Sequence, residues 1–134
     1  MDYAEQLRKT NGTNHFMIHN NITATMLTGQ EAQVTAAITP VSLNAMESVH
    51  GGLMFIMAET AAGLLTRNDG RRHVTVNSSF QFLKGTNQAE KLIAKAVVMN
   101  RGRKICVCRS SVMEPGRDMV LAEGEFTFYC LDNN

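Results

Sequence analysis

The stretch that decides the fold runs from Pro40 to Asp69 and reads PVSLNAMESVHGGLMFIMAETAAGLLTRND. Inside it, residues 53–65 form a helix-length apolar block with a single carboxylate, Glu59, near the middle. The apolar run 53–58 leaves no polar stripe, so we expect a helix that is buried on most sides. The block is shorter than the roughly 20 residues that span a bilayer. We therefore predict that the other elements wrap around one buried helix.

Glu59 is out of place in such a helix. An ionised carboxylate in apolar surroundings costs of order 5 kcal/mol unless it is compensated. One interpretation is that Glu59 faces a water-filled seam or a structural hydrogen-bond partner; the other is that it is catalytic. His50, Gly51 and Gly52 directly before the helix favour the second, because glycines and free N–H groups at a helix start admit a ligand and stabilise negative charge. An oxyanion site beside a carboxylate is typical of acyl chemistry.

Length and charge exclude several classes of function. A chain of 134 residues fits one domain with a single core. Its net charge of +1 and the lack of a basic run argue against nucleic-acid binding. The clusters Arg71-Arg72 and Arg101-Gly102-Arg103-Lys104 fit either solvated turns or contacts to one phosphate-bearing ligand. We expect no membrane partner, since no transmembrane segment and no signal peptide are recognisable.

The three cysteines, Cys106, Cys108 and Cys130, are an odd number without zinc spacing. Cys106 and Cys108 should point to one face of a strand, where neither can comfortably bridge the other. We expect all three to be reduced core thiols in a cytoplasmic protein. The four histidines and three cysteines show no metal-ligand spacing, so we expect no metal.

The rest of the chain reads as one short helix and several strands. We expect a helix over residues 2–9 that the segment 11–14 ends, and then a strand hairpin over residues 21–27 and 31–39. His15 and His19 fit surface or cap roles. After the central helix, strands are predicted over residues 73–83, 90–100, 103–114 and 119–131, with Gly102 at a turn position of positive φ. Small residues Ala122 and Gly124 should let the buried helix lie close.

This order predicts an α+β fold with an antiparallel sheet of five or six strands. Such a sheet covers one side of the helix, and the other side needs a second subunit because an exposed apolar patch of that size is unfavourable. We therefore predict a symmetric homodimer at least.

Several of these residues together resemble the hotdog-fold acyl-CoA thioesterases, in particular the phenylacetate-pathway and 4-hydroxybenzoyl-CoA thioesterase branch. The similar motifs are Asn44-x5-His50-Gly51-Gly52-x6-Glu59, the segment from Val74 to Leu83, Gly102-Arg103, and Ala122-x-Gly124-x-Phe126-Thr127-Phe128. The resemblance covers residues 35–128. It implies a hotdog fold for residues 1–134 as a single domain, with residues 1–14 as an N-terminal helix and linker.

The resemblance also implies roles for individual residues. Glu59 corresponds to the family's catalytic carboxylate, which is a nucleophile or a general base on water. The Gly51 N–H would polarise the thioester carbonyl, Asn44 would orient the carbonyl or the water, and His50 would position this loop from the facing subunit. The pantetheine arm would pass along residues 74–82. Candidate substrate-binding residues are Gly52, Thr60, Ser78, Ser79, Phe82, Gly102 and Arg103. The implied assembly is a homodimer or homotetramer that needs no cofactor, since CoA is part of the substrate.

Two positions depart from the family pattern. Many relatives have Gly where this chain has Glu47, so the turn differs or a second carboxylate enters the site. The 4-hydroxybenzoyl branch carries a hydroxyl one helical turn after the carboxylate, where this chain has Gly63; Thr60 points about a third of a turn away.

The expected reaction is hydrolysis of an acyl-CoA to free acid and CoA. Burial is expected to raise the pKa of Glu59 toward a usable base, and Gly51 would stabilise the oxyanion. The chain has no Gly-x-Ser-x-Gly motif, which argues against an α/β-hydrolase. Two alternatives stay open: an acyl-thioester hydratase or dehydratase that uses His50, and a non-catalytic acyl-CoA sensor or binding module. The acyl group cannot be identified from the sequence.

Overall fold

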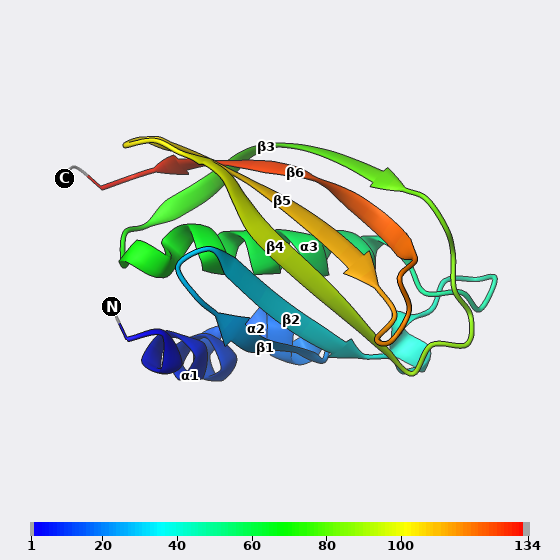
Figure 1. Cartoon of the computed structure of the whole chain (residues 1–134). Helices are drawn as coiled ribbons and strands as arrows, with labels where there is room; N and C mark the ends of the chain where they lie inside the picture. Colours follow the sequence, from blue (N-terminus) through cyan, green and yellow to red (C-terminus); the bar gives the residue numbers. More distant parts are fainter. Residues whose placement is uncertain (1, 133–134) are drawn as a thin grey trace.

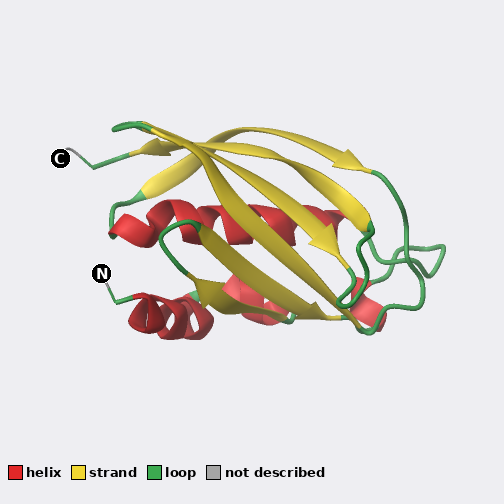
Figure 2. Cartoon of the chain, in the orientation of Figure 1, coloured by secondary structure: helices red, strands yellow, loops and turns green. Residues whose placement is uncertain are grey.

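The computed structural model describes residues 2–132, which form a six-stranded antiparallel sheet curled around one long helix (Figure 1). The helices are α1 (Tyr3–Thr13), α2 (His15–His19) and α3 (Gly51–Thr66), with short 3₁₀ turns η1 (Pro40–Ser42) and η2 (Arg67–Asp69). The strands are β1 (Ile22–Leu27), β2 (Glu31–Ala37), β3 (His73–Phe82), β4 (Lys91–Arg101), β5 (Ile105–Met113) and β6 (Val120–Cys130). Their order across the sheet is β1-β2-β4-β5-β6-β3, which makes β1 and β3 the two edges. The predicted α+β class is confirmed (Figure 2).

Helix α3 is the centre of the core, as predicted. Met57, Ala58, Ala61 and Leu65 on this helix are completely shielded from solvent. The helix packs against β2, β4 and β5 across the inner face of the sheet. Burial of this much apolar surface on one element is the main source of stability, at roughly 25 cal/mol per Å².

Both ends of α3 are capped by side chains from outside its turns. At the start, His50 Nδ1 accepts a hydrogen bond of 2.8 Å from the Gly52 N–H. At the end, the Arg101 guanidinium donates to the carbonyl oxygens of Leu65 and Thr66 at 3.2 and 3.0 Å. The last carbonyls of a helix lack the usual partner one turn further along, so these bonds from Arg101 anchor the β4–β5 hairpin to the end of α3.

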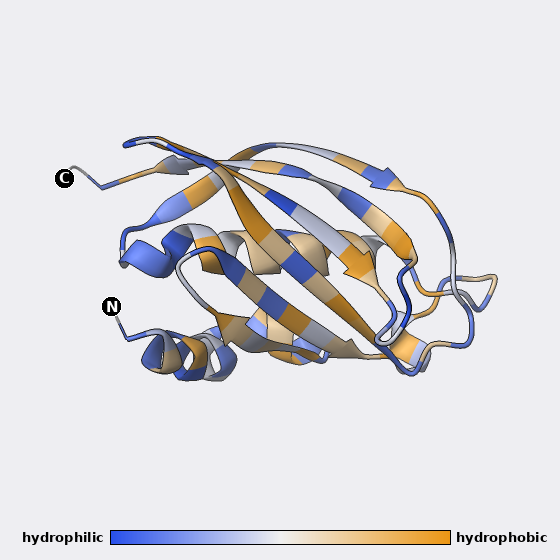
Figure 3. Cartoon of the chain, in the orientation of Figure 1, coloured by the Kyte–Doolittle hydropathy of each residue, from blue (hydrophilic) through white to orange (hydrophobic). Residues whose placement is uncertain are grey.

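The strands alternate between an inner apolar face and an outer polar face. Figure 3 shows this alternation as bands along β4 and β5. The inner face is built mainly from small and aromatic side chains: Val34, Ala36, Leu92, Ala94, Ala96, Cys106, Cys108, Val112, Phe126 and Phe128. The small residues of β2 and β4 let α3 lie close to the sheet.

The N-terminal segment is more helical than the sequence indicated. The expected end near residue 9 is too early, because α1 continues through Gly12 to Thr13, but the helix does end within the predicted segment 11–14, with Asn14 as its C-cap. The second helix α2, where an approach to a strand was expected, is started by the Asn14 side chain, which accepts a hydrogen bond from the Met17 N–H. Asn11 instead pairs with the Ala24 backbone, with bonds of 2.8 and 2.9 Å, which fixes α1 to β1. His15 and His19 are exposed, in agreement with surface roles.

Strand β3 pairs only with β6, and most of its residues are exposed. Val76 is 56% exposed and Phe82 is 58% exposed. The register with β6 shifts between Thr75 and Asn77, which leaves Val76 as a bulge. The residues before the bulge therefore face the opposite side of the sheet from the one that a regular alternation of the strand would give. Thr75 lies opposite the inward Phe128, and Val74 lies opposite the outward Tyr129.

Two expectations about glycines are also wrong. Among the described residues, the glycines with positive φ are Gly70 at 82° and Gly116 at 80°, so the hairpin after β4 does not need this conformation at Gly102. At Gly124 the closest neighbour is strand β3 and not the central helix. A Cβ at Gly124 would lie 2.1 Å from the Ser79 carbonyl oxygen and 2.6 Å from the Phe80 Cα.

No helix among residues 2–132 is both long and apolar enough to cross a membrane.

Gly124→Ala should destabilise the protein severely, because the new methyl group would overlap backbone atoms that cannot move without breaking the β3–β6 pairing. We expect a loss of at least about 3 kcal/mol in the free energy of unfolding, measured by chemical denaturation. The matched control is Gly12→Ala in α1, where a Cβ meets nothing within 4 Å and should stabilise the helix by up to about 1 kcal/mol. Equal effects of the two substitutions would contradict this account.

The three cysteine thiols should resist modification in the folded protein. Cys106, Cys108 and Cys130 are buried, and a hydrogen bond with Cys106 together with burial raises the pKa of Cys108. A disulfide-exchange reagent should therefore label none of them in native buffer and all three in guanidinium chloride. Rapid labelling of the native protein would show that β5 or β6 opens readily.

Candidate active site

Glu59 projects from the middle of α3 toward strand β3. Its Oε2 accepts a hydrogen bond of 2.6 Å from the Thr75 hydroxyl. The carboxylate forms no ion pair with any residue in the range 2–132. Glu59 is half-buried, so the expectation of a carboxylate enclosed in apolar surroundings is wrong. It is held by one short charge-assisted bond and keeps access to solvent along the sheet edge.

The β3 bulge is what brings Thr75 to Glu59. Thr75 pairs with Phe128, and Asn77 pairs with the next residue of β6, so Val76 has no opposing residue. The extra residue reverses the side of the sheet to which the preceding residues point. Thr75 therefore points inward, although the alternation of the residues after the bulge would place it on the outer face. Sequence reasoning missed Thr75 for this reason. The signal that was available is the requirement of Glu59 for a hydroxyl or amide partner.

The position one turn after Glu59 is occupied in an unusual way. Gly63 has no side chain, and the Arg67 guanidinium lies over it: a Cβ built on Gly63 would be 3.1 Å from Arg67 Nη1. Burial lowers the pKa of Arg67, and the negative charge of Glu59 raises it. Related proteins were expected to carry a hydroxyl at the position of Gly63. In this chain the hydroxyl next to Glu59 belongs to Thr75 on β3, and the Arg67 guanidinium occupies the space beside Gly63.

The start of α3 presents one unused backbone donor. His50 caps the helix by accepting the Gly52 N–H, so this N–H is not available to a ligand. The Gly51 N–H has no acceptor among residues 2–132. The Phe82 ring packs on Gly51, where a Cβ would lie 3.1 Å from Cε1. The helix start and the end of β3 therefore form one wall with a free N–H in it.

The loop before α3 is shaped by Asn44. Its Oδ1 accepts hydrogen bonds from the Met46 and Ser48 N–H groups at 2.9 and 3.1 Å. Its Nδ2 has no partner in the part of the chain that the structure describes. Glu47 has φ of 59°, so the turn keeps the left-handed conformation that glycine adopts most easily. The Glu47 side chain is exposed.

A cavity of about 300 Å³ opens between this loop and the end of β3. Asn44, Gly51, Met54, Phe82 and Lys84 are among its lining residues. Three of the residues predicted to contact substrate therefore share one cavity, with an apolar wall and the unused donors of Asn44 and Gly51 at its rim.

Other predicted substrate-binding residues lie elsewhere. Ser78 and Ser79 are exposed in β3, and Ser79 Oγ accepts a hydrogen bond of 3.4 Å from Gln81. Thr60 is half-buried, and its hydroxyl makes no hydrogen bond with the described residues. Gly102 and Arg103 lie in the β4–β5 hairpin near the opposite end of α3, where the Arg103 carbonyl accepts a bond of 3.0 Å from Arg71. The structure thus does not bring these residues together within one chain.

The separation of Gly51 and Glu59 is the main geometric constraint on the site. They are eight residues apart on one helix. At 1.5 Å per residue, this is about 12 Å along the helix axis. One carbonyl cannot contact both within a single chain.

Among residues 2–132, no group of three His, Cys, Asp or Glu side chains is placed to hold a metal ion. The donors and acceptors at the site are a carboxylate, a hydroxyl, an amide and backbone N–H groups, which suit acid–base and oxyanion chemistry.

Comparisons with known proteins agree with this geometry. A curated relative from Archaeoglobus fulgidus, named as a candidate esterase, is 29% identical over 94 residues, which is 69% of this chain and 61% of the relative. A similarly named protein from Deinococcus radiodurans is 28% identical over 90 residues, which is 67% of this chain and 61% of that relative. The match with each thus spans less than two thirds of the relative's length.

Solved structures share the fold. The PaaI protein from the phenylacetic acid degradation operon of E. coli superposes with a TM-score of 0.90 at 20% identity, covering 98% of this chain and 95% of that chain. A thioesterase from Haemophilus influenzae superposes with a TM-score of 0.85 at 19% identity, covering 94% of this chain and 90% of that chain. The architecture is the hotdog fold that the sequence resemblance implied.

The family model described as the thioesterase superfamily matches residues 46–121, a segment that contains Gly51, Glu59 and Thr75. Because this match extends over more than half of the 134 residues, the chain belongs to the thioesterase superfamily.

Proposed function

We propose that this protein hydrolyses an acyl-CoA thioester to a free carboxylic acid and CoA, at a site shared by two subunits. The observation that carries the proposal is the Glu59 carboxylate, which α3 turns toward the sheet edge and Thr75 holds at 2.6 Å. A carboxylate beside an apolar helix and open to solvent is suited to accept a proton from water. Membership of the thioesterase superfamily supports this chemistry.

The second subunit enters the proposal through the free edge of β3. This strand exposes backbone hydrogen-bonding groups together with Val74 and Val76, which would be unfavourable in a free monomer. Pairing of β3 with its copy around a twofold axis would bring the two α3 helices side by side in opposite directions. Gly51 of one subunit would then approach Glu59 of the other, which removes the separation of about 12 Å within one chain. We also propose that the dimers assemble to a tetramer and that the protein is cytoplasmic.

The chemical step uses three groups. Glu59 takes a proton from a water molecule, and the resulting hydroxide forms a bond to the thioester carbonyl carbon. The carbonyl oxygen becomes an oxyanion, which the Gly51 N–H stabilises. The carbon–sulfur bond then breaks, CoA leaves as a thiolate, and the proton on Glu59 neutralises it. In the variant mechanism, Glu59 attacks the carbonyl itself and water hydrolyses the resulting anhydride.

The alternative of a hydratase or dehydratase has less support. That chemistry needs a histidine with a free basic nitrogen, but His50 Nδ1 already accepts the Gly52 N–H. The neutral ring must therefore carry its proton on Nε2, which makes this nitrogen a donor. A non-catalytic acyl-CoA binding module would have no use for the Glu59–Thr75 pair.

Glu59→Gln should lower kcat for thioester hydrolysis about 100- to 10,000-fold, because the amide cannot accept the proton from water. Thr75→Val should lower it about 10- to 100-fold through loss of a hydrogen bond to a charged group, and Thr75→Ser should keep most of the rate. Thiol release from a panel of short, long and aromatic acyl-CoAs measures both effects. The control Thr23→Val changes an exposed residue of β1. Full activity of Glu59→Gln would show that Glu59 is not the catalytic base.

The oxyanion role of the Gly51 N–H can be tested with two substitutions of similar bulk. Proline is well tolerated at the first position of a helix, and His50 has the extended backbone (φ −64°, ψ 132°) that a following proline requires. Gly51→Pro removes the N–H and Gly51→Ala keeps it. We expect kcat of the proline variant to be about 100- to 1,000-fold below that of the alanine variant. Similar rates for the two variants would exclude this donor.

The shared site predicts complementation between subunits. A mixed dimer of Glu59→Gln and Gly51→Pro subunits has one site in which both groups are intact. It should therefore recover up to about half of the wild-type rate, while each parent dimer stays inactive. No recovery in purified mixed dimers would place each site within one subunit.

A further inference from the structure

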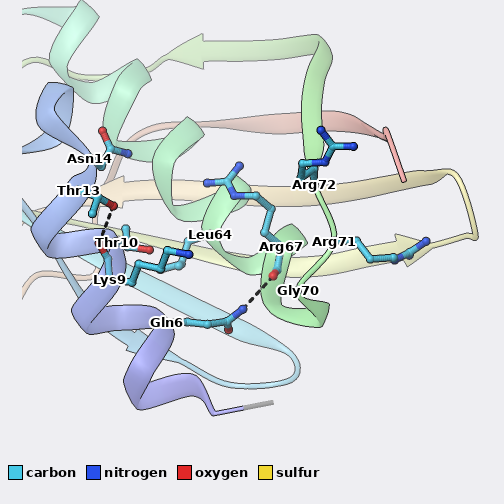
Figure 4. A pocket seen from close by; sticks show the side chains of 10 residues that line it. All are labelled: Gln6, Lys9, Thr10, Thr13, Asn14, Leu64, Arg67, Gly70, Arg71 and Arg72. Atoms are coloured by element: carbon cyan, nitrogen blue, oxygen red, sulfur yellow. Dashed lines mark hydrogen bonds between the residues drawn. The ribbon is translucent and has the colours of Figure 1, made fainter. Parts of the chain in front are cut away.

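A second cavity, of about 460 Å³, lies between α1 and the end of α3 (Figure 4). Its lining residues include Gln6 and Lys9 from α1, and Arg67, Arg71 and Arg72 from the segment that follows α3. Four of these side chains are cationic, and no carboxylate belongs to the lining. The Gln6 Nε2 donates a hydrogen bond of 3.1 Å to the Arg67 carbonyl, which ties the two walls together.

The cations of this cavity differ in what they already bind. Arg71 Nε contacts Asp69 Oδ2 at 2.9 Å, and Arg72 Nη2 contacts Asp132 Oδ1 at 2.7 Å. These two charges are compensated, and Figure 4 shows the Arg71 side chain pointing away from the cavity. In contrast, neither the Lys9 ammonium nor the Arg67 guanidinium makes a hydrogen bond or ion pair with any residue in the range 2–132; Lys9 takes part only through its carbonyl, which accepts a bond of 2.7 Å from the Thr13 hydroxyl. Two cations in one cavity are therefore free to bind an anion.

Arg67 is the better placed of the two. Its guanidinium folds back over Gly63, where an added Cβ would lie 3.1 Å from Arg67 Nη1. Burial lowers the pKa of Arg67, and the nearby negative charge of Glu59 raises it, so the guanidinium is a partly desolvated cation close to the carboxylate of Glu59. The cavity wall also contains the Gln6 Oε1, a buried acceptor without a donor among the described residues. Since an amide oxygen only accepts hydrogen bonds, the groups of this wall that can bind an anion are the Arg67 guanidinium and the Lys9 ammonium.

We propose that Arg67 and Lys9 bind a carboxylate at the far end of the acyl group, so that the preferred substrates are thioesters of short dicarboxylic acids. This inference rests on the proposed thioester hydrolysis. It assigns to Arg67 the role of a specificity-determining residue.

The position of Arg67 relative to Glu59 selects the acyl group as the source of the anion. The thioester carbonyl must lie within hydrogen-bonding reach of Glu59 or of its water. The Arg67 guanidinium lies at the level of Gly63, one helical turn, or about 6 Å along the axis, from Glu59. A carboxylate separated from the carbonyl by a few methylenes spans this distance. The phosphates of CoA are separated from the thioester by the whole pantetheine arm, so they lie too far away.

The experiment compares two acyl groups on two thiols. Glutaryl and glutaramyl differ only in a terminal carboxylate or amide, and each is made as a CoA thioester and as an N-acetylcysteamine thioester, which has no phosphate. The wild-type protein should prefer glutaryl in kcat/KM by about 10- to 100-fold on both thiols, as expected for a hydrogen-bonded charge pair. Arg67→Gln should abolish this preference, and Arg67→Lys should retain part of it.

Neighbouring residues on α1 provide matched controls. Lys9→Gln should reduce the preference for glutaryl, whereas Arg8→Gln removes an exposed cation that pairs with Glu5 and should leave the preference unchanged. Melting curves of all variants check that the fold is intact.

Each other outcome overturns the proposal in a recognisable way. A loss in Arg67→Gln that affects both acyl groups equally, and only as CoA thioesters, would assign Arg67 to a phosphate. An equal loss with all four substrates would mean that Arg67 acts through Glu59. Equal wild-type rates for glutaryl and glutaramyl thioesters would leave hydrolysis established and remove the carboxylate site.

A binding measurement separates failure of this inference from failure of the proposed function. Calorimetric titration with glutarate and glutaramate needs no turnover. Glutarate should bind at least about 10-fold more tightly to wild type, and Arg67→Gln should bind the two equally. If no thioester is hydrolysed but glutarate binding depends on Arg67, the proposed hydrolysis is wrong and the carboxylate-binding site stands. If hydrolysis occurs and glutarate is not preferred, only the dicarboxylate site falls.

Discussion

The hydrogen bond between Thr75 and Glu59 connects the central helix to the edge of the sheet, and the candidate site depends on it. A carboxylate on a helix that is otherwise buried has to be solvated, paired or neutralised. Here one hydroxyl binds one oxygen at 2.6 Å, and the side chain keeps contact with solvent along β3. This arrangement leaves the second oxygen of Glu59 free for a water molecule. A buried arginine in direct contact would have satisfied both oxygens and left none for the proposed base.

The two ends of α3 differ in how their free backbone groups are satisfied. At the start, the His50 ring satisfies one orphan N–H and leaves the N–H of Gly51, so the positive end of the helix dipole is presented at a single donor. At the other end, Arg101 donates to the carbonyls of Leu65 and Thr66, so the side chain of Arg67, which caps the helix through its backbone N–H, is not needed there. An arginine in the last turn of a helix usually interacts with these carbonyls. Its release from that role allows Arg67 to fold back over Gly63 toward the carboxylate.

Much of the fold was predictable from the sequence, because one apolar block of helical length and several alternating segments determine it. The central helix, the six strands and the His50-Gly51 helix start follow from periodicity and capping rules. The continuation of α1 through Gly12 was not predictable, because the decisive contact is tertiary: Asn11 pairs with the backbone of β1 at Ala24. The close approach at Gly124 was assigned to the wrong partner for a similar reason, since the register of β3 against β6 is not visible in either strand alone.

The positions of the site residues were predictable where they depend only on spacing along the sequence. They were not predictable where a bulge or the course of a long side chain decides which groups meet. Gly51 lies at the start of α3, Glu59 lies in its middle and Asn44 lies in the loop before it, as their spacing predicted; their roles stay predictions. Thr75 reaches the inner face only because Val76 is an extra residue in the ladder, and a single bulge in an edge strand has no sequence signature here.

Gly63 is the clearest case of a residue whose meaning changes with the structure. As part of a sequence it reads as the loss of a hydroxyl one turn after the carboxylate. In the folded chain the same absence makes room for the Arg67 guanidinium, which a Cβ at this position would approach to 3.1 Å. The hydroxyl has moved to β3, and a cation has taken its former space. Because a guanidinium without an acceptor is unfavourable in a half-buried cavity, the exchange is stable only if water or an anion occupies the cavity.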